Sequence, residues 1–231
     1  MRKSLISLLL ITASTGVAFA DGMSDSAKQW RGAYVGAHLG YAWGDVDVTD
    51  TSGGVTPGPF SYSPDGVFGG VTAGYNFQAG CVVFGVEGDA GYMDLTGAGV
   101  IPSSNPIYHQ DITLDGGFYA LIAGRLGFAW DNNLLYAKAG WAYFDGEASQ
   151  KTTKPGYETD PTGAFSGAVY GAGIEHFISP NVSMKVEYLH FDFGSEDGDQ
   201  VSISDPPIGF VYTNTTDLTA DSVKLGVTFH L

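Results

Sequence analysis

A two-residue alternation of apolar side chains with small or polar ones constrains this chain more than any other feature of its sequence. A period of two is typical of a β-strand whose two faces meet different surroundings. The alternation recurs in eight segments, at about residues 32–44, 66–78, 82–94, 117–130, 134–145, 166–177, 182–193 and 217–231. We therefore predict an all-β fold with eight strands.

The connections between these segments alternate between short and long. Three are tight, at residues 78–81, 130–133 and 178–181, and their Gly, Asn and Pro residues suit hairpin turns. The other four are about 16 to 24 residues long and hold most of the Pro, Ser, Thr and Asp. This rhythm is typical of an outer-membrane barrel with short periplasmic turns and long extracellular loops. It predicts an eight-stranded antiparallel up-and-down transmembrane β-barrel.

The two faces of the strands indicate which side meets lipid. A soluble barrel of the lipocalin type would turn its apolar face inward and need a polar outer wall. Here the second face is mostly Gly and Ala with a few charges, which suits a crowded lumen. The apolar face also carries aromatic residues near both strand ends, among them Trp43, Tyr188, Phe77 and Phe229. Two aromatic girdles are expected on a lipid-facing wall, so we favour the membrane barrel over a soluble carrier.

The N-terminal residues form a targeting segment. Arg2 and Lys3 precede an apolar stretch, and Ala18-Phe19-Ala20 provides small residues around a cleavage site. This pattern predicts a cleaved signal peptide at residues 1–20. A short periplasmic tail at residues 21–29 and the barrel at residues 30–231 would follow. No later segment has the 18 consecutive apolar residues that indicate a membrane helix.

The charge balance restricts both the partners and the lumen. The chain has 10 Lys and Arg against 25 Asp and Glu, a formal net charge of −15. Nucleic acid is therefore not an expected partner, because binding it needs a basic surface. Eight charged residues fall on the inward face of the predicted strands, namely Glu87, Asp89, Arg125, Lys138, Glu175, Lys185, Glu187 and Lys224.

These eight residues carry equal numbers of positive and negative charges. Unpaired buried charges are costly, so a neutral set predicts a network of ion pairs. Eight strands leave an interior just wide enough for side chains. We therefore expect a plugged barrel; a selective ion pathway through the same residues is the alternative.

The acid excess lies mainly in the predicted loops. Residues 196–199, Glu-Asp-Gly-Asp, could bind Ca²⁺ or Mg²⁺ through carboxylate oxygens but lack the full calcium-loop spacing. Divalent cations that bridge acidic loops to lipopolysaccharide form a second hypothesis. Tyr108 and His109 are residue types that ligate haem iron. His190 and Asp192 form the nearest candidate catalytic pair, but no nucleophile accompanies them. We predict no catalytic residue, no metal site, no cofactor and no enzymatic activity.

Four short motifs resemble one known family. The segment Gly85-Val86-Glu87-Gly88-Asp89-Ala90-Gly91-Tyr92 resembles a third-strand motif of small outer-membrane surface barrels of alphaproteobacteria. These are the RopB-type proteins of the porin family, with opacity-protein and OmpA-like barrels as wider relatives. Residues 30–36, 125–128 and 186–188 look like the first, fourth and seventh strands of that family.

The resemblance implies an eight-stranded barrel with roles in envelope integrity and host contact, and some members bind haemin. Such barrels usually end on Phe, which the barrel-assembly machinery recognises, whereas this chain ends on Leu231. The outward residues of its last strand are Val223, Leu225, Val227, Phe229 and Leu231, and we expect them to serve as the insertion signal.

The function predicted from the sequence is structural and interactive. A barrel in the cell outer membrane would display four acidic loops outside the cell and keep its termini in the periplasm. Its expected partners are outer-membrane lipid and lipopolysaccharide, the barrel-assembly machinery and a host or surface ligand. A small-solute channel and a ligand receptor, for example for haemin, are the alternatives.

Overall fold

The computed structural model describes residues 29–50, 60–102, 109–152, 157–159, 164–202 and 211–231. The predicted signal peptide, nearly all of the predicted tail and Tyr108 lie outside these residues. Within the described residues, no helix is long and apolar enough to cross a membrane.

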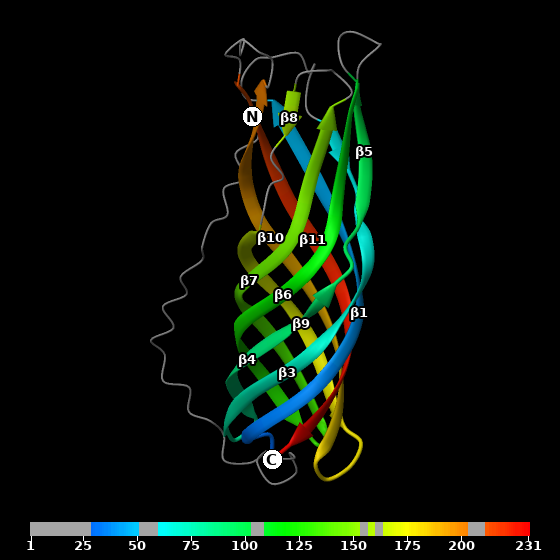
Figure 1. Ribbon diagram of the computed structural model, residues 1–231. Coiled ribbons are helices and arrows are strands. Elements are labelled where there is room, and N and C mark those ends of the chain that lie inside the picture. Colours follow the sequence, from blue (N-terminus) through cyan, green and yellow to red (C-terminus); the bar gives the residue numbers. More distant parts are fainter. Residues whose placement is uncertain (1–28, 51–59, 103–108, 153–156, 160–163, 203–210) are drawn as a thin grey trace, which may run out of the picture.

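Eight long antiparallel strands form a closed ring (Figure 1). They are β1 (Gly32–Asp50), β3 (Asp65–Ala79), β4 (Val82–Met93), β6 (His109–Trp130), β7 (Asn133–Thr152), β9 (Phe165–Phe177), β10 (Val182–Ser202) and β11 (Val211–His230). Each pairs with its neighbour in the chain, and β11 pairs with both β10 and β1. Closure removes the free strand edges that a bilayer cannot satisfy. The predicted eight-stranded antiparallel barrel is confirmed.

The three predicted tight turns lie at one end of the ring, which we call the turn end, and the long connections lie at the other, the loop end. Gly80 adopts a φ of +59° in the turn between β3 and β4, and Asp131 a φ of +47° in the next turn. Such left-handed values are those that a two-residue hairpin turn requires. Residue 30 and the C-terminal Leu231 both lie at the turn end, where the Leu231 N–H donates to the Ala33 carbonyl at 3.0 Å.

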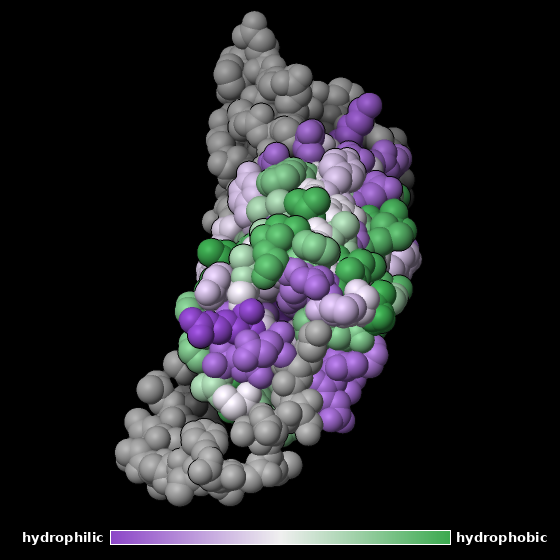
Figure 2. Space-filling view, turned by 90° about the horizontal axis from the view of Figure 1, so that it is seen from below, coloured by the Kyte–Doolittle hydropathy of each residue, from purple (hydrophilic) through white to green (hydrophobic). Residues whose placement is uncertain are grey.

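The apolar face of the alternation is the outer face. Leu39 is 65% exposed and Ile122 is 68% exposed, whereas their neighbours His38 and Leu121 are buried. Seen from below, the surface carries patches of hydrophobic side chains next to hydrophilic ones (Figure 2), and the exposed hydrophobic residues include Leu39, Val71, Ile122 and Leu225. An apolar outer band of this kind is what a lipid-facing wall requires.

Several strands continue well beyond the predicted ends. The prediction ended the first strand at residue 44 and began the fourth at residue 117, but β1 runs to Asp50 and β6 starts at His109. β7, β10 and β11 are extended in the same way. Three short strands join the ring at the loop end: β2 (Phe60–Tyr62), β5 (Gly97–Pro102) and β8 (Tyr157–Thr159), of which Figure 1 labels the last two. Much of what was predicted as loop is therefore barrel wall.

In this extension the two faces exchange their chemistry. Asp45 and Asp47 point outward on β1, while Val46 and Val48 are buried inside. Ten buried apolar residues in and next to this extension, which we call the apolar tier, belong to one core cluster: Val46, Val48, Leu95, Ile112, Leu114, Phe144, Phe165, Phe191, Phe193 and Leu218. Water outside the wall explains this exchange. Polar side chains are then solvated on the outer face, and the hydrophobic effect favours burial of apolar side chains in the interior.

Phe60 and Tyr62 of β2 pack against the apolar tier. A Cβ atom at Gly99 of β5 would lie 2.7 Å from the Phe60 ring, and one at Gly97 would lie 3.2 Å from the Tyr62 ring. These glycines therefore let the two aromatic rings of β2 pack closely against β5. Burial raises the pKa of Tyr62 to about 12.

Candidate functional site: a charge network sealed inside the barrel

The eight charged residues predicted on the inward face lie together in the middle of the lumen. Glu87, Asp89, Arg125, Lys138, Glu175, Lys185, Glu187 and Lys224 are each at most 4% exposed. They come from six strands, β4, β6, β7, β9, β10 and β11, because each occupies an inward position of the two-residue alternation. Four are acidic and four are basic, so their formal charges cancel.

Glu87 lies at the centre of this network. Its carboxylate accepts hydrogen bonds from Lys138 Nζ at 2.5 Å, from Lys185 Nζ at 2.9 Å and from Arg125 Nη1 at 3.0 Å. The Tyr34 hydroxyl donates to the same carboxylate at 2.8 Å. A buried carboxylate needs several such donors, because the attraction of one cation rarely repays the loss of its hydration.

Arg125 connects Glu87 to a second acid. Its Nη2 donates to Glu175 Oε2 at 2.9 Å. The guanidinium group also lies over the Tyr136 ring, 4.3 Å from its centre, in a cation–π contact. The Tyr136 hydroxyl donates to Glu187 Oε1 at 2.8 Å, so this tyrosine joins the two sides of the network.

Lys224 holds the remaining two acids together. Its Nζ lies 2.7 Å from Asp89 Oδ2 and is also ion-paired with Glu187. Thr72 donates to the other Asp89 oxygen at 2.5 Å and lies 2.9 Å from His38 Nδ1. His38 is in turn hydrogen-bonded to the Tyr119 hydroxyl, which belongs to the apolar cluster toward the loop end. The polar groups therefore continue up to the apolar residues.

Three of the acids could in principle hold a metal ion. Glu87, Asp89 and Glu187 each offer one oxygen, and these atoms lie within 4.8 Å of one another. Lys138 is within 4.0 Å of all three carboxylates, and Lys224 is ion-paired with two of them. A divalent cation would have to displace these ammonium groups, so the arrangement favours ion pairing over metal binding.

Apolar side chains lie above and below the charge network. The apolar tier fills the loop end. At the turn end, Trp30, Val83, Ala129, Leu134, Tyr136 and Phe177 form the lower apolar cluster. Trp30 is fully buried, and its ring packs against Phe177 with centroids 4.3 Å apart. Hydrogen bonds hold the Trp30 backbone in place: its backbone N–H donates to Gln78 Oε1 at 2.6 Å and its carbonyl accepts from Asn76 Nδ2 at 3.2 Å.

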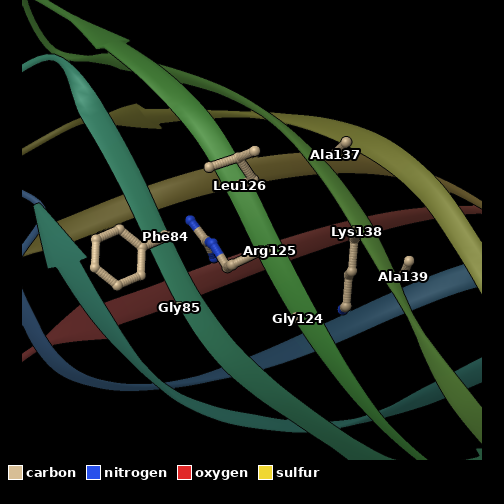
Figure 3. Close-up of a pocket in the computed structure, with 8 residues that line it drawn as sticks. All are labelled: Phe84, Gly85, Gly124, Arg125, Leu126, Ala137, Lys138 and Ala139. Carbon is tan, nitrogen blue, oxygen red and sulfur yellow. The ribbon is translucent and has the colours of Figure 1, made fainter. Parts of the chain in front are cut away.

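On β6 and β7, the outward side chains beside the network are small. A depression of about 350 Å³ lies there, lined by Phe84, Gly85, Gly124, Arg125, Leu126, Ala137, Lys138 and Ala139 (Figure 3). Gly124, Ala137 and Ala139 face outward and give this part of the lipid-facing surface little side-chain cover, whereas Arg125 and Lys138 are buried in the lumen. The backbone layer is therefore the main separation between the lipid side and these two cations.

The other residues singled out in the sequence lie elsewhere. Val223, Leu225, Val227, Phe229 and Leu231 all point outward and are between 41% and 73% exposed. His109 lies 3.6 Å from Asp111 at the start of β6. His190 does not pair with Asp192 as the sequence suggested; it lies 2.8 Å from Asp221 on the neighbouring strand β11. Residues 196–199 belong to β10 rather than to a loop, and their side chains lie outside the described part of the structure.

Three residues of the site lie outside the charged set that the sequence singled out. Tyr34 and Tyr136 occupy inward positions on β1 and β7, where hydroxyl groups can reach the buried acids. Trp30 precedes β1 and belongs to no alternating segment, so its role at the turn end could not be read from a strand pattern.

Comparison with known proteins identifies the family. Residues 5–230 match the model of the outer membrane protein beta-barrel domain. The 22 kDa outer membrane protein of Rhizobium leguminosarum bv. viciae is 30% identical over 202 residues, which cover 87% of this chain and 78% of the relative. The chain belongs to the outer membrane protein beta-barrel family. It is therefore a β-barrel protein of the cell outer membrane, and the predicted resemblance to alphaproteobacterial surface barrels is confirmed.

Two further comparisons agree with this family. The 25 kDa outer-membrane immunogenic protein of Brucella abortus biovar 1 is 31% identical over 170 residues, which cover 74% of this chain and 68% of the relative. The crystal structure of the outer membrane protein OprG from Pseudomonas aeruginosa superposes with a TM-score of 0.51 at 13% identity, covering 90% of this chain and all of that one. At this identity the likeness concerns the fold alone.

Proposed function

We propose that this family member is a structural anchor in the outer membrane that holds a rigid, acidic β-extension above the cell surface. The observation that supports this most directly is the filling of the lumen. A neutral network of ion pairs occupies the middle, and apolar side chains occupy both ends. A barrel filled in this way serves as a wall rather than a conduit.

The small-solute channel is the competing function. A solute would have to displace the apolar tier, the ion pairs and the lower apolar cluster in succession, and each step would expose buried groups at a cost. Planar-bilayer recording of the folded monomer tests this directly. We expect no reproducible conductance steps, and a defined step size from monomer that migrates as folded in unheated gels would overturn the anchor proposal.

The proposed orientation places the loop end outside the cell. Residues 1–20 would be removed as a signal peptide, residues 21–29 would remain in the periplasm, and residues 30–231 would form the barrel. The longer connections lie at the loop end, and in outer-membrane barrels the longer connections are extracellular. The polar outer face of the extension is consistent with water on that side. Protease treatment of intact cells should cleave within residues 51–59 or 203–210, whereas cleavage in the tight turns would reverse the orientation.

Surface contact is the second part of the proposal. The Brucella relatives are named outer-membrane immunogenic proteins, and exposure at the cell surface would account for such a name. We extend that exposure to this chain, with outer-leaflet lipid and lipopolysaccharide, the assembly machinery and a host or surface ligand as partners. The outward aspartates of the extension, such as Asp45 and Asp47, could be bridged to lipopolysaccharide by divalent cations.

A haemin receptor remains the second alternative. His109 lies within 3.6 Å of Asp111, so an acid is available to orient its ring. Titration of the folded protein with haemin tests this function. A shift of the Soret band that His109→Ala removes would support the receptor, and its absence would leave the anchor as the better account.

A further inference from the structure

Four neighbouring strands place a row of four side chains on the outer face of the barrel. Trp43 of β1 lies opposite Asp221 of β11, Asp221 lies opposite His190 of β10, and His190 lies opposite Tyr170 of β9. Directly opposed residues on one face of an antiparallel pair have neighbouring Cβ atoms. The row therefore presents a polar pair flanked on each side by an aromatic ring.

The polar pair is held in a defined geometry. His190 Nδ1 lies 2.8 Å from Asp221 Oδ1, and the Tyr188 hydroxyl donates to the same oxygen at 2.6 Å. The His190 and Tyr170 rings are in contact, with centroids 5.0 Å apart. The His190 and Asp221 side chains are 27% and 29% exposed, and Trp43 and Tyr170 are more exposed than either.

The row lies where the outer wall changes from apolar to polar. On the side toward the turn end, its neighbours are Tyr41, Val223, Tyr188 and Ala172. On the side toward the loop end they are Asp45, Thr219, Asp192 and Ala168. In the family's membrane this boundary is the level of the lipid headgroups, where aromatic girdles lie. The row is thus continuous with the apolar wall that we assign to the lipid.

The charges around the row restrict what it can bind. These twelve positions include no Lys or Arg and three aspartates, namely Asp45, Asp192 and Asp221. A phosphate group would be repelled there. A neutral ligand rich in hydroxyl groups fits better, since a carboxylate accepts O–H donors and the second imidazole nitrogen can donate or accept.

We infer that this row binds the sugar headgroup of an outer-leaflet glycolipid. A pyranose ring has hydroxyls along its rim, which match Asp221 and His190. Its C–H faces suit the negative face of an aromatic ring, which Tyr170 offers next to His190 and Trp43 offers next to Asp221. The lipid tail of the same molecule would lie along the apolar wall next to Tyr188 and Val223. The inference rests on the proposed orientation only for the choice of leaflet.

Native mass spectrometry of the protein released from phosphatidylcholine nanodiscs that contain monoglucosyl diacylglycerol tests the inference. We expect at least ten-fold more retained glucosyl lipid than retained phosphatidylethanolamine or phosphatidylglycerol at equal membrane fractions. Tyr170→Ala and His190→Ala should each lower that retention at least five-fold, and Tyr170→Phe should restore it. The control is Tyr75→Ala, which removes an exposed tyrosine near the turn end and should retain as much as the parent.

Equal retention of the three lipids, or preferential retention of phosphatidylethanolamine, would overturn the sugar assignment. Equal loss in the Tyr75→Ala control would overturn the location. Heat-modifiable gel migration of every variant shows that each compared barrel is folded. Both leaflets of the nanodisc carry the glycolipid, so this result does not depend on which end of the barrel lies outside the cell. The protease experiment on intact cells tests that orientation separately.

Discussion

The ion pair between Arg125 and Glu175 offers a direct measure of what the charge network contributes. Both side chains are about 1% exposed, and Arg125 is the one Lys or Arg within 4.0 Å of Glu175 among the described residues. Arg125→Met would leave Glu175 as a buried charge without this cation, while Glu87 would keep Lys138 and Lys185. We expect the free energy of unfolding in lipid vesicles, measured with urea, to fall by about 3–5 kcal/mol.

The double variant Arg125→Met/Glu175→Gln separates the loss of pairing from the loss of packing. Removal of both charges avoids the uncompensated carboxylate, so the double variant should be more stable than Arg125→Met alone. If the two variants are equally unstable, the cost comes from the shape of Arg125 over Tyr136 rather than from the orphaned charge of Glu175.

Gly74 leaves space for the Tyr34 hydroxyl that donates to Glu87. A Cβ atom at this position would collide with that hydroxyl and would lie 2.7 Å from the carbonyl oxygen of Val86. We expect Gly74→Ala to lower the free energy of unfolding by about 1–3 kcal/mol, because overpacking forces neighbours out of place. Gly88→Ala is the matched control, since its Cβ would meet Leu121 O at 3.5 Å. Equal losses in the two variants would show that steric conflict at Tyr34 is not the cause.

At the scale of the strands, the sequence predicted number, pairing and sidedness, but not length. The eight alternating segments were sufficient because a ring of consecutive hairpins needs no long-range information. The extensions were missed because Asp45, Asp47 and Asp50 suggested a loop, although Val46 and Val48 continue the alternation between them. The period persists while the polar face moves from inside to outside. The period alone, without an assumed apolar outer face, predicts the longer β1.

For the lumen, the sequence predicted which charged residues lie inside but not which of them pair. The eight charged residues follow from the phase of the strands, since every inward position is set once one is known. Which ion pairs with which depends on strand tilt and side-chain reach across the lumen, as in the 98-residue separation between Glu87 and Lys185. No sequence periodicity carries that information.

A bulge in β10 directs the strand from the membrane wall into the extension. The register with β11 shifts between Asp192 and Ser195, and Gly194 adopts a φ of +70° with open space around its Cβ position. Gly194→Ala should therefore cost about 1–2 kcal/mol through the backbone alone. We expect faster hydrogen exchange in residues 195–202 and 211–217, with residues 182–192 unchanged.

Gly194→Asn is the informative companion variant, because Asn tolerates left-handed conformations better than Ala. Its exchange rates should lie nearer to those of the parent protein. An equal increase for Asn and Ala would indicate that the bulge is sensitive to any side chain rather than to its φ angle.

The whole molecule is one continuous barrel that meets two solvents along its length. Where lipid surrounds the wall, apolar residues face out and charges pair inside. Where water surrounds it, aspartates face out and the apolar tier fills the interior. The same two-residue alternation serves both zones, and one-residue bulges in β6 and β10 shift its phase at the boundary. The proposed anchor function depends on this continuity, since the extension has the membrane barrel as its base.

The apolar tier and the lower apolar cluster should each block water from one end of the lumen, independently of the other. Cysteine labelling can measure reagent access from each end. In a Cys81→Ser background, Thr228→Cys would report access from the turn end and Ser222→Cys access from the loop end; both native side chains are fully buried. Trp30→Ala should expose Thr228→Cys to a charged methanethiosulfonate reagent and leave Ser222→Cys protected.

The double substitution Phe144→Ala/Phe193→Ala should do the reverse, because these rings lie 6.0 Å apart in the apolar tier. Both cysteines should resist labelling when neither the apolar tier nor the lower apolar cluster is altered. Labelling of both cysteines after either substitution would mean that water passes the charge network freely, and the lumen would then be a gated channel rather than a filled wall.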